Sequence, residues 1–113
     1  MKISQILENA LVLIRDEKNW TRGVHARDKG GDPCSPSDIR ACSFCSVGAV
    51  MCITGEFNPE YFEAIKSLEF TVKYEVPVED SRFCLSAYND AHTHDKVIQV
   101  WRKTIHRERS HGR

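Results

Sequence analysis

Five cysteines are the most reactive side chains of this 113-residue chain, and two of them lie close together. Cys42 and Cys45 are separated by two residues, and two thiolates at that spacing can hold one metal ion. A structural zinc site needs four ligands, however, and the sequence has no second close pair. Cys34 and Cys84 would have to join the first pair through folding. We therefore expect no metal and no cofactor, and we interpret these cysteines as small buried thiols.

Cys45 is the candidate nucleophile, because it lies at the start of an apolar run that reads as a helix, and a helix start lowers the pKa of a thiol. His25 or His94 would act as its base, and Asn89 or Asp90 would orient that base. Such a set would make a cysteine-dependent hydrolase or transferase. The chain has no local signature of a cysteine enzyme, and an inert buried thiol fits the same residues. Both interpretations stay open, and we expect native Cys45 to alkylate slowly.

A ligand site is the second hypothesis, and its candidate residues are Trp20, Arg27, Asn89 and Asp90. Trp20 lies in a polar, glycine-rich segment, and its large indole favours an ordered loop. Together with Arg27 it could bind an anionic or planar ligand by stacking and by a guanidinium fork. Asn89 and Asp90 precede the last expected helix, where such side chains commonly fix a turn. The sequence thus predicts either a polar pocket closed by the Trp20 loop or a helix-entry turn.

The elements that position these residues are mostly helical in the first half of the chain. Apolar residues recur every three or four positions over residues 4–17, with Ser4 as the expected N-cap. Glycine, proline and charged residues predict a long loop over 19–36. Residues 45–54 are apolar on all sides, which predicts a central buried helix. Gly48 in its middle indicates that another backbone packs closely against it.

The second half predicts two further helices and a hairpin. Asn58 is the expected N-cap of a helix over 58–68, and Thr93 is the expected N-cap of a final helix over 94–107. Apolar and polar residues alternate from Phe70 to Val78, and a turn before Phe83 would complete a hairpin within 70–87. The predicted fold class is mainly α, or α+β with one short β-hairpin, in a compact domain of about four helices.

The composition is that of a globular protein, with 41% hydrophobic and 28% charged residues and a net charge of zero. We expect one globular domain over 1–107 and a basic C-terminal tail over 108–113. A basic tail can contact nucleic-acid phosphates, but a solvated end is the more common role of such a segment. We therefore expect a protein partner rather than a nucleic acid.

The sequence shows no signal peptide and no apolar run of the length that spans a bilayer. The odd number of cysteines argues against a disulfide framework and favours a reducing compartment. We expect a cytoplasmic protein that does not associate with membranes.

Three short motifs resemble those of a family of small bacterial and phage proteins, domain-of-unknown-function family 6197. They are Trp20-Thr-Arg-Gly-Val-His-Ala-Arg-Asp28, Cys45-Ser-Val-Gly-Ala49 and Tyr88-Asn-Asp90. The resemblance spans most of the chain, although Tyr88 and Ser46 stand where the family pattern has tryptophan and alanine. It implies a shared fold and a bacterial or phage setting, and it supplies no activity.

Two functions of different class follow as hypotheses. The first is a small non-enzymatic binding or regulatory protein of bacterial or phage origin that acts on a host protein. The alternative is the cysteine-dependent enzyme built on Cys45.

Overall fold

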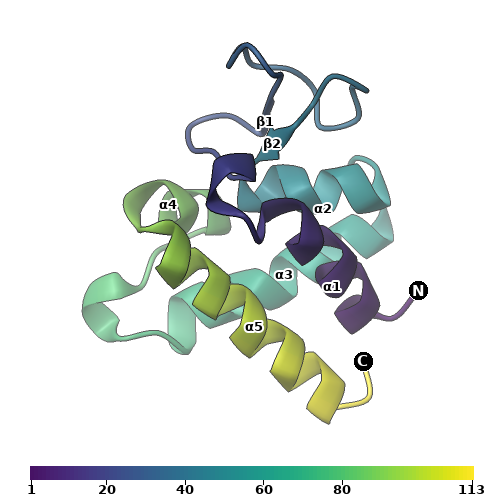
Figure 1. Ribbon diagram of the computed structural model, residues 1–113. Helices are drawn as coiled ribbons and strands as arrows, with labels where there is room; N and C mark the ends of the chain where they lie inside the picture. Colours follow the sequence, from purple (N-terminus) through teal and green to yellow (C-terminus); the bar gives the residue numbers. More distant parts are fainter.

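The computed structural model describes residues 1–113 and contains five α-helices with one short antiparallel sheet. Figure 1 shows the segment that connects α1 to α2 as a separate layer above the helices, with both chain ends on the same side of the molecule. In chain order the elements are α1 (Ile3–Ile14), a 3-10 turn (Glu17–Asn19), β1 (Ala26–Arg27), β2 (Ser43–Phe44), α2 (Ser46–Thr54), α3 (Pro59–Tyr74), a second 3-10 turn (Val78–Asp80), α4 (Leu85–Ala91) and α5 (His94–Ser110).

The core forms where α1, α2, α3 and α5 pack together, with α4 closing one end. Trp101 of α5 is fully buried at its centre, and Leu7, Val50 and Leu68 from three other helices are equally inaccessible. Burial of one such side chain contributes roughly 1.5–3 kcal/mol, so this apolar cluster dominates the stability of the domain.

Local sequence signals position three of the helices as predicted. The Asn58 side chain accepts a hydrogen bond from the backbone N–H of Tyr61, and Thr93 accepts one from that of Lys96, so both N-caps are confirmed. The buried helix predicted over 45–54 is α2, and it ends at Gly55, where φ is 81°.

The first helix begins earlier and ends earlier than the predicted 4–17. Lys2 is its N-cap, and the backbone N–H of Lys2 donates to the side chain of Gln5. Ser4 is buried at the second position of the helix, so its assignment as the N-cap is wrong. The helix ends at Ile14 because Asp16 caps the following 3-10 turn, its carboxylate accepting from the Lys18 N–H.

The hairpin predicted within 70–87 is wrong, because α3 continues to Tyr74 and α4 begins at Leu85. Thr71 and Val72 are buried one turn after Leu68, so the helical spacing of the core face continues through the supposed strand. The alternation arose because Phe70 and Tyr74 are large apolar residues that lie on the exposed face of the helix.

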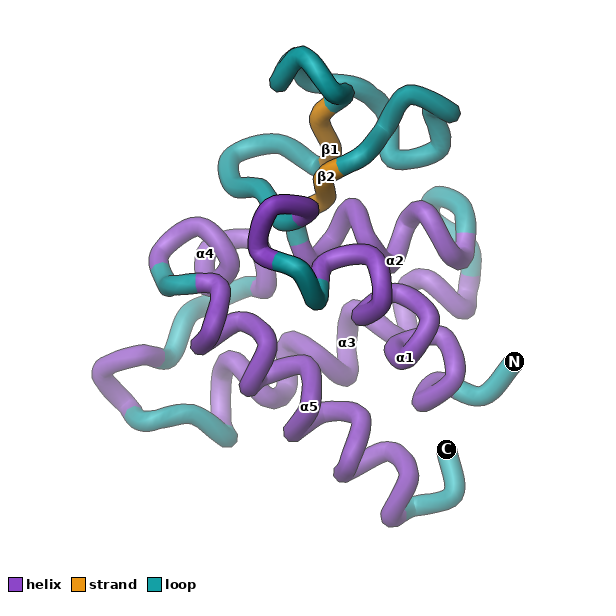
Figure 2. Tube along the Cα trace, in the orientation of Figure 1, coloured by secondary structure: helices purple, strands orange, loops and turns teal.

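The sheet lies instead between β1 and β2, with Ala26 opposite Phe44 and Arg27 opposite Ser43. Figure 2 shows these two strands at the base of the long loop layer. The segment from Trp20 to Phe44 is called the loop layer below.

The predicted tail begins inside α5, which runs to Ser110. Glu108 is only 3% exposed, and its carboxylate accepts a hydrogen bond from Arg113 at 3.0 Å. The carbonyl of Arg113 accepts from the N–H of Ser4 at 3.0 Å, so residues 108–113 pack against the start of α1.

No helix of the structure combines the length and the apolar character needed to cross a bilayer.

Candidate functional site

The loop layer is joined to the helices where it crosses the start of α2. An ideal Cβ built on Gly48 would lie 1.8 Å from the backbone oxygen of His25, far inside any permitted contact. The N–H of Cys45 donates to the same oxygen at 3.1 Å. The close backbone approach predicted from Gly48 is therefore confirmed.

Asn89 of α4 is the centre of the contact between the loop layer and the helices. Its side-chain oxygen accepts hydrogen bonds from Trp20 Nε1 at 2.8 Å and from both the N–H and the hydroxyl of Ser46, at 3.0 and 2.8 Å. Its amide nitrogen donates to the Thr21 carbonyl at 3.1 Å and to the Asp90 carboxylate at 3.2 Å. Asn89 is completely buried, and both of its amide hydrogens have acceptors.

The same contact extends on both sides of Asn89. Asp90 accepts a hydrogen bond from the N–H of Gly23 at 3.0 Å, which fixes the loop three residues after Trp20. On the core side, the buried Trp101 Nε1 donates to the Ser46 hydroxyl at 3.1 Å. We call Trp20, Ser46, Asn89 and Asp90 the loop joint, since they tie the loop layer to α2 and α4.

Arg27, predicted as a ligand contact, braces the loop layer from within. Its guanidinium donates to the Thr21 hydroxyl at 2.8 Å and to the carbonyls of Gly31 and Arg22, both at 3.1 Å. The structure therefore brings Trp20, Asn89 and Asp90 together in one hydrogen-bonded network and places the Arg27 guanidinium on the loop backbone.

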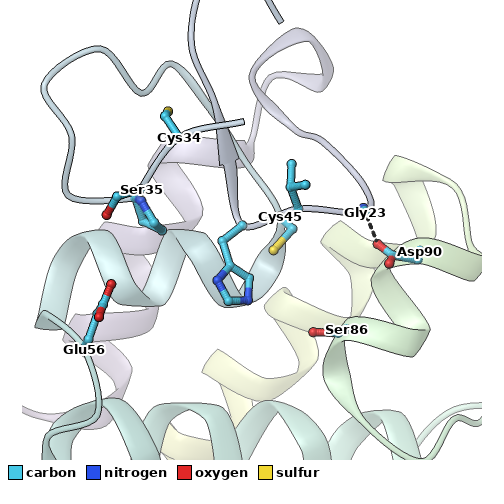
Figure 3. Close-up of a pocket in the computed structure, with 10 residues that line it drawn as sticks. Gly23, Cys34, Ser35, Cys45, Glu56, Ser86 and Asp90 are labelled. Carbon is cyan, nitrogen blue, oxygen red and sulfur yellow. Dashed lines mark hydrogen bonds between the residues drawn. The ribbon is translucent and has the colours of Figure 1, made fainter. Parts of the chain in front are cut away.

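A cavity of about 490 Å³ lies beside the loop joint, and it brings together three of the four candidate catalytic residues: His25, Cys45 and Asp90. Figure 3 shows the Cys45 sulfur between Ser35 and Glu56 on one side and Ser86 and Asp90 on the other.

His94, the fourth candidate, lies elsewhere. Its Nε2 is 2.7 Å from the carbonyl oxygen of Ile14, and its ring packs 5.4 Å from that of Trp20. It therefore joins α5 to the end of α1 and does not face the cavity.

Cys45 is the N-cap of α2, and its thiol is nearly inaccessible, with the residue 4% exposed. Sγ accepts a hydrogen bond from the N–H of Gly48 at 3.3 Å. Burial raises the pKa of the Cys45 thiol, and the backbone N–H groups of Gly48 and Val47 oppose that increase only in part. Loss of solvent around the Cys45 thiol thus raises its pKa more than the start of the helix lowers it.

All five cysteines are free thiols. Cys42 is exposed whereas Cys45 is buried, so the two thiols of the Cys-x-x-Cys pair lie in different environments. No three histidine, cysteine, aspartate or glutamate side chains are grouped so that they could hold a metal ion.

Comparison with known proteins identifies the family of this chain. A family model described as "Family of unknown function (DUF6197)" matches residues 1–107. The chain belongs to this family. No curated protein and no solved structure matches the chain.

The residues that carried the resemblance to DUF6197 converge in space. Trp20 and Asn89 share a hydrogen bond, Gly23 binds Asp90, and Gly48 packs on the backbone of His25. In this member of the family, the motif residues build the joint between the loop layer and the helices.

Sequence reasoning missed a second feature, the outward side of α3. Four of the five phenylalanines are exposed, and only Phe44 is buried. Phe62, Phe70 and Tyr74 lie on α3 and are 54%, 47% and 71% exposed. Phe83, in the loop after α3, is 88% exposed, and the Lys73 ammonium lies 5.6 Å from its ring centroid. We call Phe62, Phe70, Tyr74 and Phe83 the aromatic face.

The signal for this face was present in the sequence, since Phe70 and Tyr74 are one helical turn apart in a segment that the alternation assigned to a strand. Val78 adds to it, because this valine is 87% exposed in the same connection between α3 and α4.

Most of the basic residues at the C-terminal end are engaged within the domain. Arg109 pairs with Glu8 at 2.7 Å, Arg113 pairs with Glu108, and Lys103 donates to the Glu75 carbonyl at 2.7 Å. Arg107 binds the Ser67 carbonyl at 2.6 Å and also pairs with the Glu75 carboxylate. Of the five lysine and arginine side chains in residues 101–113, only that of Arg102 makes no hydrogen bond or ion pair.

Proposed function

We propose that this chain is a small non-enzymatic binding protein that occupies the surface of a protein partner through its aromatic face. The observation that carries the proposal is the exposure of Phe62, Phe70, Tyr74 and Phe83 on and beside one helix. Contact between large apolar side chains and water is unfavourable, so covering these side chains with a partner contributes favourable binding free energy. Aromatic residues are also enriched at the centres of protein interfaces, where they contribute most of the binding free energy.

The loop joint supports a structural role for the family motifs rather than a catalytic one. The side chain of Asn89 is committed to Trp20, Ser46, Thr21 and Asp90, so it is not free to orient a catalytic histidine. A network of this kind stabilises the loop layer and leaves binding to another surface.

The engagement of the basic residues with Glu8, Glu75 and Glu108 supports a protein partner over nucleic acid. Pairing within the domain reduces the counterion release that phosphate contacts would bring. By its resemblance to bacterial and phage proteins, we place the chain in a bacterial cytoplasm, or in the host cytoplasm if it is phage-encoded. Five free cysteines accord with that reducing compartment.

Affinity capture with matched variants tests this proposal. The wild-type chain, a Tyr74→Ser/Phe83→Ser variant and an Ile39→Ser control would each be immobilised and exposed to bacterial lysate at low and moderate salt. Ile39 is a suitable control because it is completely exposed but lies in the loop layer. We expect one protein to be retained by the wild type and the control and to be lost from the double variant. Equal retention by all three chains, or no retention by any, would contradict the proposal.

A second candidate function is thiol chemistry at Cys45, as a hydrolase or transferase. The observation that favours it is the shared cavity, which Cys45 lines together with His25 and Asp90. In this scheme His25 takes the thiol proton, the thiolate attacks an acyl carbon, and the group expelled from that carbon leaves with the proton that His25 returns. Asp90 would orient the imidazole. The burial of the thiol and its raised pKa argue against this scheme.

Alkylation separates the two candidates. Native protein treated with iodoacetamide near pH 6.5 would be analysed by mass spectrometry to assign the modified cysteines. The binding proposal predicts that the exposed Cys42 and Cys52 react before Cys45. Selective modification of Cys45 ahead of both would favour the enzyme.

A further inference from the structure

Beyond the use of the aromatic face as a binding surface, its surrounding charges indicate the chemistry of the partner. Lys66 and Lys73 lie on the outward side of α3, and neither ammonium belongs to any ion pair of the chain. The two lysines are seven residues apart, which places them on one side of the helix, about 10 Å apart along its axis. Phe70 and Tyr74 lie beside them on the same outward surface.

The carboxylates of this helix are, by contrast, largely used within the domain. Glu60 pairs with the N-terminal ammonium at 3.4 Å, and Glu69 accepts the N–H of Leu85 at 2.9 Å. Glu75 pairs with Arg107. Glu63 alone among these acids makes no such contact. Lys66 and Lys73 are therefore the two basic side chains that α3 offers to a partner without an ion pair in the chain.

A hollow of about 570 Å³ lies next to Phe70. Lys66 and Glu63 line it from α3, and the other charged lining residues come from the end of α5: Arg107, Glu108, His111 and Arg113. Arg113 pairs with the buried Glu108 and Arg107 pairs with Glu75, so these charges balance one another within the domain. Lys66 is thus the one lysine or arginine of this hollow that has no ion pair in the chain.

We propose that the aromatic face binds an amphipathic helix of a protein partner, with apolar side chains against the rings and acidic side chains against Lys66 and Lys73. This inference rests on the proposed function and names the partner's chemistry. A helix laid along α3 can present carboxylates seven residues apart, which matches the spacing of the two lysines. Opposite charges at the edge of an apolar contact speed association and fix its register.

Fluorescence anisotropy with synthetic peptides tests the inference. The probe is a labelled amphipathic helix of about 18 residues, long enough for five turns. It carries leucines on one face and glutamates seven residues apart at the edge of that face. A matched peptide carries glutamine in place of each glutamate, and a single-stranded DNA oligonucleotide serves as a polyanion without an apolar face.

We expect the wild-type chain to bind the glutamate peptide about tenfold more tightly than the glutamine peptide at low salt, with a smaller difference as salt screens the contact. Lys66→Glu/Lys73→Glu should remove that difference, whereas Lys29→Glu, an exposed charge in the loop layer, should leave it unchanged.

The inference is overturned if both peptides bind equally, if the double charge reversal has no effect, or if DNA binds more tightly than the glutamate peptide. If neither peptide binds while lysate capture still depends on Tyr74 and Phe83, the inference fails and the proposed function stands. If lysate capture does not depend on Tyr74 and Phe83, the proposed function itself fails.

Discussion

The loop joint and the aromatic face differ in how completely the fold uses their side chains. In the loop joint, Asn89 is fully buried and its amide makes hydrogen bonds to two other segments of the chain, the loop layer and the start of α2. On the aromatic face, Tyr74 and Phe83 keep most of their surface in water. The loop joint fits a structural role, because its buried polar groups have hydrogen-bond partners within the domain. The aromatic face leaves large apolar side chains exposed, which is what the proposed binding role requires.

Substitution of Gly48 should have the largest effect on stability. Gly48→Ala places a Cβ where the backbone oxygen of His25 lies, and neither backbone can move without breaking the contact between β1 and α2. We expect a loss of about 3 kcal/mol or more in the free energy of unfolding, measured by urea denaturation. Gly30→Ala is the control, since its Cβ would meet only an ordinary contact at 3.5 Å. Equal stabilities of the two variants would show that the joint tolerates displacement.

Removal of the Asn89 side chain should have the next largest effect. Asn89→Ala leaves the indole N–H of Trp20 and the buried N–H of Ser46 without their acceptor. We expect a cost of about 3 kcal/mol, because each buried unsatisfied group costs about 1–3 kcal/mol. Thermal unfolding of this variant would be compared with that of Ser86→Ala, an exposed neighbour on the same helix. A cost below that of the control would mean that the joint is not a structural element.

The stability of the segment that carries Phe83 should depend on pH. Hydrogen bonding from Lys96 to Asp80 lowers the pKa of that carboxyl below its usual value. A carboxyl whose pKa is lower in the folded state stabilises the fold above its unfolded pKa, and this stabilisation is lost as the pH falls through the folded pKa. Lys96→Met should therefore raise the pKa of Asp80, and carbon-detected NMR titration of the side-chain carboxyl measures it. An unchanged titration would mean that Lys96 does not hold this loop.

Substitutions on the aromatic face should have the smallest effect on stability. Tyr74→Ser and Phe83→Ser remove side chains that are mostly exposed, so each should change the free energy of unfolding by less than about 0.5 kcal/mol. Chemical denaturation provides the test. A loss comparable to that of Asn89→Ala would show that the rings stabilise the fold rather than wait for a partner.

The sequence predicts those parts of the structure that depend on neighbouring residues. Asn58 and Thr93 cap their helices through bonds to residues three positions away, so their type and place are sufficient. Gly48 predicted a close approach of another backbone, because glycine destabilises a helix interior and is expected there where a Cβ would not fit.

The remaining features depend on contacts between distant segments. Trp20 and Asn89 are 69 residues apart in the sequence. Sequence patterns therefore left two alternatives for Asn89, a pocket closed by the Trp20 loop or a helix-entry turn. The hairpin prediction failed for a related reason, because Phe70 and Tyr74 are apolar but exposed. Their pattern is set by a surface outside the core, whereas the periodicity argument assumes that large apolar residues are buried.

The most direct test of the account is to map the bound surface by NMR. Amide shifts of the labelled chain would be followed while the protein captured from lysate is added. We expect the largest changes within residues 62–83, on α3 and the loop that follows it. Changes centred on the cavity of His25, Cys45 and Asp90, with residues 62–83 unaffected, would contradict it.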